Sequence, residues 1–273
     1  AMLGTVPAYD PYWDKLWRAD GSDQFPWENT IIFNLAAPAD KKVPEKIAKM
    51  QAYNAKLDKL YDKGFDGVWS DNLIFALLGR PSRCNNPKWN CATIDADRDG
   101  IGDDPTTLAK NYDNGLYTVG KLLRQWLPGK YVGGNGMASE DSDYYTGDEP
   151  NGWLKAGNVT LLENLDRYWL KDAVGAAWII NRANEWVDFP DPYGMPRFSA
   201  TMQRALGADG KLIDLPDGED PNQNKYKLDL GVMQSMRWGL TLSLIADIYY
   251  EIYLETHGTD WWYDEFDGGD AFA

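Results

Sequence analysis

The sequence predicts an α/β fold built on parallel strands, and more specifically a (β/α)8 barrel of the TIM type. Short apolar runs alternate with longer segments of helical period, which is typical of a parallel sheet. Several of these runs end on carboxylates or amides, as strands do at the functional face of an α/β barrel. We therefore expect a single catalytic barrel-type domain over residues 1–273, with a loop insertion at 80–106.

The elements follow one another in strand–helix order. One helix is expected from 43 to about 62, where apolar residues recur every three or four positions, and a second from about 104 to 126, with Pro105 suited to its first turn. Six strands are visible, near residues 30–36, 67–71, 130–135, 159–163, 198–203 and 244–250. A closed barrel needs eight. Either two strands lie in the irregular ends, or the barrel is incomplete and a partner chain or self-association closes it.

The charge and composition of the chain limit the classes of molecule that it is expected to bind. The formal charge of -15 repels nucleic acid phosphates, and no apolar run reaches the roughly 18 residues of a membrane span. Aromatic residues make up 14% of the chain, with 13 tryptophans. Such residues either fill a core or stack on the faces of sugars, so carbohydrate is the partner class that the composition favours.

Two cysteines, Cys84 and Cys91, lie close together in a polar segment rich in Pro and Asn. This spacing predicts a local disulfide that staples the insertion, and hence an extracellular or secreted protein. The alternative is a pair of free thiols in a cytosolic protein.

The insertion continues with an acidic segment that resembles an EF-hand-type calcium loop in its spacing. Acids stand at relative positions 1, 3, 5 and 9, and Gly100 stands at position 6. Position 12 is Thr106, where a bidentate Glu is usual, so the match is partial. The sequence predicts a structural Ca²⁺ site, against the alternative of a solvated acidic loop. The predicted ligands are Asp95, Asp97, Asp99, Ile101 and Asp103.

Polar residues at the strand ends are the candidates for chemistry. Glycoside cleavage needs two carboxylates, one to protonate the leaving oxygen and one to act as nucleophile or to activate water. Asp71 and Glu163 are the catalytic candidates, although Asp71 is also suited to capping a helix and Glu163 to an ion pair. The expected substrate-binding residues lie at the other strand ends and near the C-terminus: Asn72, Asn135, Asn164, Asp247, Trp261, Trp262, Asp264 and Glu265.

Several motifs, in order, resemble those of glycoside-hydrolase-like TIM-barrel families that are distantly similar to the α-amylase superfamily. The motifs are Gly64-Phe65-Asp66-Gly67-Val68-Trp69-Ser70-Asp71, Gly134-Asn135-Gly136, Leu161-Leu162-Glu163-Asn164, Met236-Arg237-Trp238-Gly239-Leu240, Asp247-Ile248-Tyr249-Tyr250, and His257-Gly258 with Trp261-Trp262-Tyr263-Asp264-Glu265. The resemblance implies a glycosidase-like barrel with Asp71 and Glu163 as its catalytic pair. This sequence departs from the family's pattern at Ile248, where the family usually has Gly. The chain also resembles a family member that is truncated at both ends.

The sequence therefore predicts a secreted glycoside hydrolase that acts on a polysaccharide or oligosaccharide. Two alternatives stay open: a non-catalytic carbohydrate-binding protein on a degenerate barrel, and a surface or assembly protein.

Overall fold

The computed structural model describes residues 8–22, 32–57, 64, 66–70, 93–135, 156–163, 173–213, 226 and 228–253. The chain forms two compact units. The first comprises Ala1–Leu161 with Phe189–Arg197, and the second comprises Leu162–Asp188 with Phe198–Ala273. Each unit is described by itself below.

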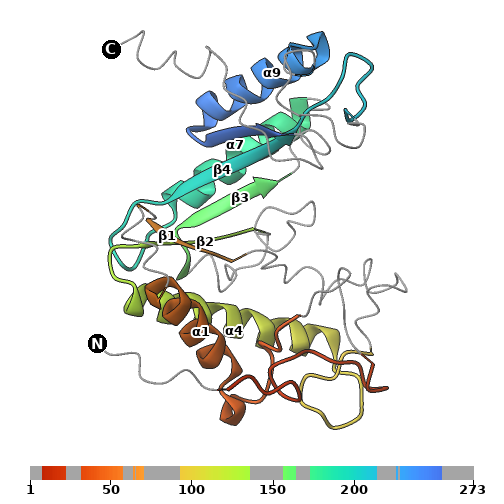
Figure 1. Ribbon diagram of the computed structural model, residues 1–273, viewed down its shortest axis with the longest axis vertical. Coiled ribbons are helices and arrows are strands. Elements are labelled where there is room, and N and C mark those ends of the chain that lie inside the picture. Colours follow the sequence, from red (N-terminus) through yellow and green to blue (C-terminus); the bar gives the residue numbers. More distant parts are fainter. Residues whose placement is uncertain are drawn as a thin grey trace. The chain divides into compact units, whose positions relative to one another are not determined.

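Two helices form the base of the first unit, α1 (Val43–Leu57) and α4 (Pro105–Trp126), which lie side by side (Figure 1). A short 3-10 helix, η1 (Ala39–Lys41), precedes α1. The apolar stripe of α4 is buried, from Leu108 to Leu123, as its helical period requires. Asp104 caps α4 by accepting a hydrogen bond from the Thr107 amide at 2.9 Å, and Pro105 occupies the first turn.

Two parallel strands lie in this unit, β1 (Gly67–Ser70) and β2 (Tyr131–Asn135). The first three residues of β3 (Val159–Glu163) also lie in it and pair with β2 in parallel, whereas Leu162 and Glu163 belong to the second unit. Gly134 is in register with Ser70 on one side and with Thr160 on the other. The order β1, α4, β2 is the strand–helix–strand unit that the sequence predicts. The parallel α/β character of the fold is thereby confirmed.

The predicted strand at 30–36 is wrong over the residues that the structure describes. Residues 32–36 make only an isolated antiparallel bridge, between Phe33 and Lys15. The backbone of the segment bonds the N-terminal residues instead, with the Asn34 amide donating to the Asp14 carbonyl at 2.9 Å. The segment also packs on α4 where Gly115 lacks a side chain, because a Cβ there would lie 2.2 Å from the Leu35 carbonyl oxygen.

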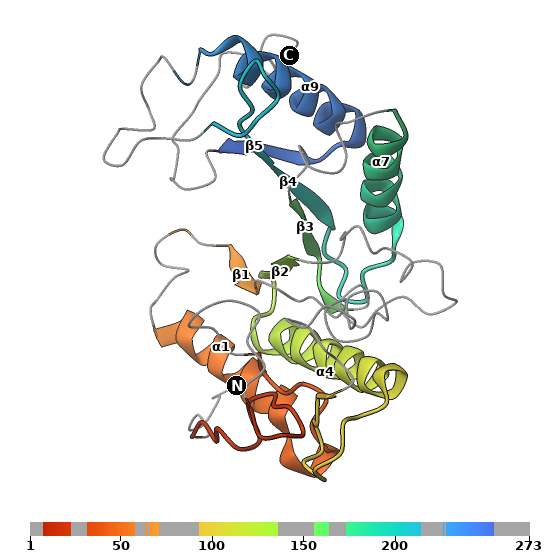
Figure 2. The same ribbon diagram turned by 90° about the vertical axis from the view of Figure 1, so that its right-hand side faces the viewer.

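The second unit pairs β4 (Phe198–Arg204) with β5 (Tyr249–Tyr253) in parallel, covered by the helices α7 (Ala173–Asp188) and α9 (Leu230–Ala246). Figure 2 shows α9 lying over the two strands. The buried core here is formed by Ala205, Val232, Met236 and Ile252. Gly239 of α9 allows close packing, because a Cβ there would lie within 2.0 Å of the Gln203 side chain.

The predicted strand at 244–250 is displaced in the structure. Helix α9 continues through Ala246, and Asp247 then adopts a left-handed conformation, φ 53°, that ends the helix. The apolar run around Ile245 therefore belongs to the helix, and β5 begins only at Tyr249.

The closed eight-stranded barrel of the prediction is not confirmed, since the described residues contain five strands and these do not form a closed ring. Helix α4 is capped at Asp104, within the predicted insertion at 80–106. Cys84 and Cys91 lie outside the described residues, so the structure offers no support for the predicted disulfide.

Candidate functional site

The predicted catalytic residues belong to the carboxyl ends of β1, β2 and β3. Within the first unit the strands are parallel and in register, so Ser70 of β1, Asn135 of β2 and Leu161 of β3 lie toward the same edge of the sheet. Asn135 ends β2 and Glu163 ends β3, as the sequence predicts. Asp71 follows Ser70, the last residue of β1, directly in the sequence. Asp71, Asn72 and Asn164 themselves lie outside the described residues.

An exposed tryptophan stands just before this edge. Trp69 of β1 is 44% exposed, which is uncommon for the largest apolar side chain within a sheet. Its ring covers Gly133 of the neighbouring strand, where a Cβ would lie 2.5 Å from Cε3 of the indole. Gly133 thus leaves room for the indole ring of Trp69, which stands two positions before Asp71 in the sequence.

Asp247 does not belong to this kind of edge, which corrects the sequence prediction. It precedes β5 and therefore stands at the amino end of that strand. It is also exposed. Trp261, Trp262, Asp264 and Glu265 lie outside the described residues.

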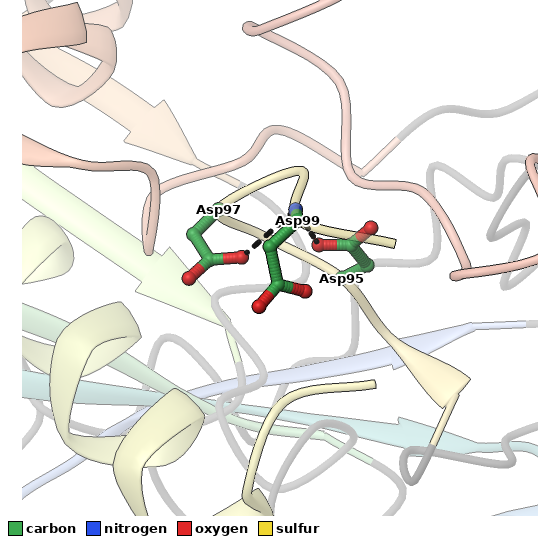
Figure 3. A group of neighbouring side chains, drawn as sticks. All are labelled: Asp95, Asp97 and Asp99. Carbon is green, nitrogen blue, oxygen red and sulfur yellow. Dashed lines mark hydrogen bonds between the residues drawn. The ribbon is translucent and has the colours of Figure 1, made fainter. Parts of the chain in front are cut away.

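The acidic loop before α4 brings three carboxylates together. One oxygen each from Asp95, Asp97 and Asp99 lies within 4.8 Å of the others (Figure 3). Asp95 is buried, at 4% exposure, whereas Asp97 and Asp99 are exposed. Three of the five predicted metal ligands are thus grouped, and an oxygen-only set of this kind fits a hard cation such as Ca²⁺.

The loop backbone sets this arrangement. Gly100 turns the chain with φ at +86°, a conformation that glycine adopts without strain. The carboxylate of Asp95 accepts from the amides of Asp99 at 3.1 Å and Gly100 at 3.0 Å. The Asp99 carboxylate accepts from the Ile101 amide at 2.7 Å. The carboxylates of Asp95 and Asp99 thus accept from amides further along the chain, and the three carboxylates gather around the turn.

Asp103 stands apart from the cluster of three. Its Oδ2 atom accepts a hydrogen bond from the Ala96 amide at 2.6 Å, which closes the loop across its base. Burial raises the pKa of Asp103 above its usual 3.8, and repulsion from Asp97, Asp95 and Asp99 raises it further, against the opposing effect of the Ala96 hydrogen bond. A cation in the loop would relieve this repulsion. Ile101, the remaining predicted ligand, has a side chain that is 69% exposed.

Contacts with distant residues hold the loop in place. Asn34, fully buried, donates from Nδ2 to the Ala96 carbonyl at 2.9 Å, and the Asp95 amide donates to the Trp17 carbonyl at 3.0 Å. Arg98 bonds the Tyr12 carbonyl, and its guanidinium lies 4.8 Å from the ring centres of Tyr12 and Trp17. These anchors could not be predicted from the sequence, where the one local signal is an asparagine, Asn34, within an apolar run.

No protein-family model and no curated protein matches this sequence. The fold and its residues therefore carry the functional argument. In the part of the chain that the structure describes, no helix has the length and apolarity needed to cross a bilayer.

Proposed function

We propose that this protein is a glycoside hydrolase that acts on a polysaccharide or oligosaccharide. The observation that carries the proposal is the parallel register, within the first unit, of β1, β2 and the first three residues of β3. Glu163 ends β3, and Asp71 comes directly after β1 in the sequence. In this proposal Glu163 is the general acid/base, and Asp71 is the nucleophile or the base that activates water.

Two carboxylates suffice for the reaction. The protonated acid donates its proton to the glycosidic oxygen as the bond to the sugar carbon breaks. The second carboxylate either attacks that carbon or removes a proton from an attacking water. Asn135 supplies an amide at the end of the strand between them, which suits a sugar hydroxyl, and Trp69 offers an aromatic surface for the sugar face. The formal charge of -15 is compatible with a neutral glycan.

The test is a hydrolysis screen across a polysaccharide panel with the wild-type chain and with Asp71→Asn and Glu163→Gln. Each amide variant should lose nearly all hydrolysis while its circular dichroism spectrum stays unchanged. Asp66→Asn is the control: Asp66 is exposed and pairs with Lys130 at 3.8 Å, so activity should be retained. Hydrolysis by both amide variants would contradict the assignment. Glycan binding without hydrolysis by the wild type would favour the non-catalytic alternative.

We also infer that the loop of Asp95, Asp97 and Asp99 binds Ca²⁺ as a structural ion. The support is the grouping of three carboxylate oxygens within 4.8 Å together with their effect on Asp103. Because the loop leads directly into the cap of α4, a bound ion would stabilise the start of that helix. A ligand at 1,000 times its dissociation constant adds about 4 kcal/mol to the free energy of unfolding.

Chelation should accordingly lower the melting temperature of the wild-type chain, and added Ca²⁺ should restore it. Asp97→Asn with Asp99→Asn changes two exposed side chains, so this variant should fold but lose its response to chelator. An unchanged melting temperature on chelation and on Ca²⁺ addition would show the loop to be a solvated acidic turn.

A further inference from the structure

A pocket of about 460 Å³ in the first unit uses none of the residues assigned to hydrolysis. It lies between the turn at 35–39, the start of α1 and the middle of α4. Its volume falls within the range of small-molecule sites, roughly 300–1,000 Å³. Its polar side chains in the described part of the chain come from three segments: Glu45, Asp97, Asn111, Asn114 and Thr118.

The walls of the pocket are fixed by packing. The turn at 35–39 approaches α4 closely at Gly115, where no Cβ would fit against Leu35. The Thr118 hydroxyl donates to the Asn114 carbonyl at 2.9 Å, within α4 itself. Asp97, which also lines the pocket, belongs to the acidic loop. Asn34 anchors that loop by donating a hydrogen bond to the Ala96 carbonyl. The site is therefore preformed, which lowers the entropy cost of binding.

Most of the polar side chains that line the pocket are carboxylates or amides. Glu45 and Asp97 each bring a carboxylate, and within the described part of the chain neither forms an ion pair and no Lys, Arg or His joins the lining. Asn111 and Asn114 each offer both donors and an acceptor, the combination that a hydroxyl needs. Two carboxylates in a lining that includes no Lys, Arg or His favour a cationic ligand.

We propose that this pocket binds a small organic cation that carries hydroxyl groups, of the size and chemistry of an amino sugar. Its ammonium group pairs with Glu45 and Asp97, and its hydroxyl groups bond the amides of Asn111 and Asn114. The assignment is independent of hydrolysis at the strand ends. It shares Asp97 with the acidic loop, so a metal ion bound there competes for that carboxylate.

The test is a calorimetric titration of the full chain with D-glucosamine, in chelator so that no metal ion occupies Asp97. D-glucose, which lacks the ammonium group, is the matched ligand. Glucosamine should bind saturably. Glucose should bind with a dissociation constant roughly tenfold higher, or not at all, because it lacks about one charge-assisted hydrogen bond. Rising salt should weaken glucosamine binding.

Glu45→Gln should weaken glucosamine binding roughly tenfold, while Glu251→Gln, an exposed acid on β5, should leave it unchanged. Asn114→Ala is a second test that changes no charge. It should weaken glucosamine binding and leave the preference for glucosamine over glucose intact. Equal binding of glucose and glucosamine, or unaltered binding by a folded Glu45→Gln, would overturn the proposal. So would the absence of any saturable binding of glucosamine to the wild-type chain.

Discussion

The ion pair between Arg124 and Asp191 offers the sharpest test of how the first unit is held together. It joins α4 to the loop at 189–197, with Nη2 and Oδ2 2.7 Å apart and side chains that are 1% and 4% exposed. The same Asp191 oxygen accepts from the Met195 amide at 2.8 Å, and the guanidinium lies 4.7 Å from the centre of the Tyr193 ring. The pair is thus almost fully removed from water.

Replacing Asp191 by Asn should be strongly destabilising. The amide keeps the shape of the side chain but leaves the guanidinium buried without its counter-charge, which costs about 3–5 kcal/mol. Asp66→Asn is the matched control, because the Asp66–Lys130 pair spans 3.8 Å and Asp66 is 82% exposed. Loss of such a surface pair costs about 0–1 kcal/mol. Urea denaturation followed by tryptophan fluorescence measures both free energies of unfolding.

A double replacement separates charge from shape. Arg124 Nη1 and Asp191 Oδ1 are both buried and have no hydrogen-bond partner among the residues that the structure describes, so the pair itself carries uncompensated desolvation. Arg124→Met with Asp191→Leu should therefore recover most of the loss caused by Asp191→Asn. Equal costs for Asp191→Asn and Asp66→Asn would refute the reasoning, and so would a double variant that is no more stable than Asp191→Asn.

Three further outcomes follow from single contacts. Gly115→Ala should cost about 1–3 kcal/mol in urea denaturation, since the new Cβ would lie 2.2 Å from the Leu35 carbonyl oxygen. Trp186→Phe should cost about 1–3 kcal/mol, because the partly buried Phe198 carbonyl loses its indole donor at 3.0 Å. The pKa of Asp103 is higher in the folded protein than its value of 3.8 in the unfolded chain. In the metal-free protein Asp103 therefore adds to the free energy of unfolding below pH 3.8, and this contribution is lost as the pH rises through the folded pKa. Added Ca²⁺ should therefore raise the melting temperature more near neutral pH than at about pH 4.

The parts of the fold that the sequence predicted well are those decided by neighbouring residues. Helix α4 was expected from about 104 to 126 and spans Pro105–Trp126, because Asp104 and Pro105 mark its start locally. Strands β1 to β4 lie within a residue or so of their predicted positions, since short apolar runs between helices leave few alternatives.

The errors arose where distant contacts decide the backbone. The run at 30–36 has the composition of a buried strand, yet its described residues bond Asp14 and pack on Gly115, which no local pattern reveals. At Asp247 the error was one of period. The run around Ile245 suits either element, and the left-handed cap after Ala246 assigns it to the helix.

The same distinction separates the candidate sites. The acidic loop is contiguous, so its spacing alone predicted that Asp95, Asp97 and Asp99 would meet. The strand-end residues required one more step, the parallel register, which pairs Asn135 at the end of β2 with Leu161 of β3. The pocket required tertiary packing: Glu45, Asp97 and Asn111 meet only because Gly115 admits the turn at 35–39 against α4. Gly115→Ala should therefore weaken glucosamine binding as well as stability, whereas a pocket that tolerated a side chain there would owe its shape to something other than this contact.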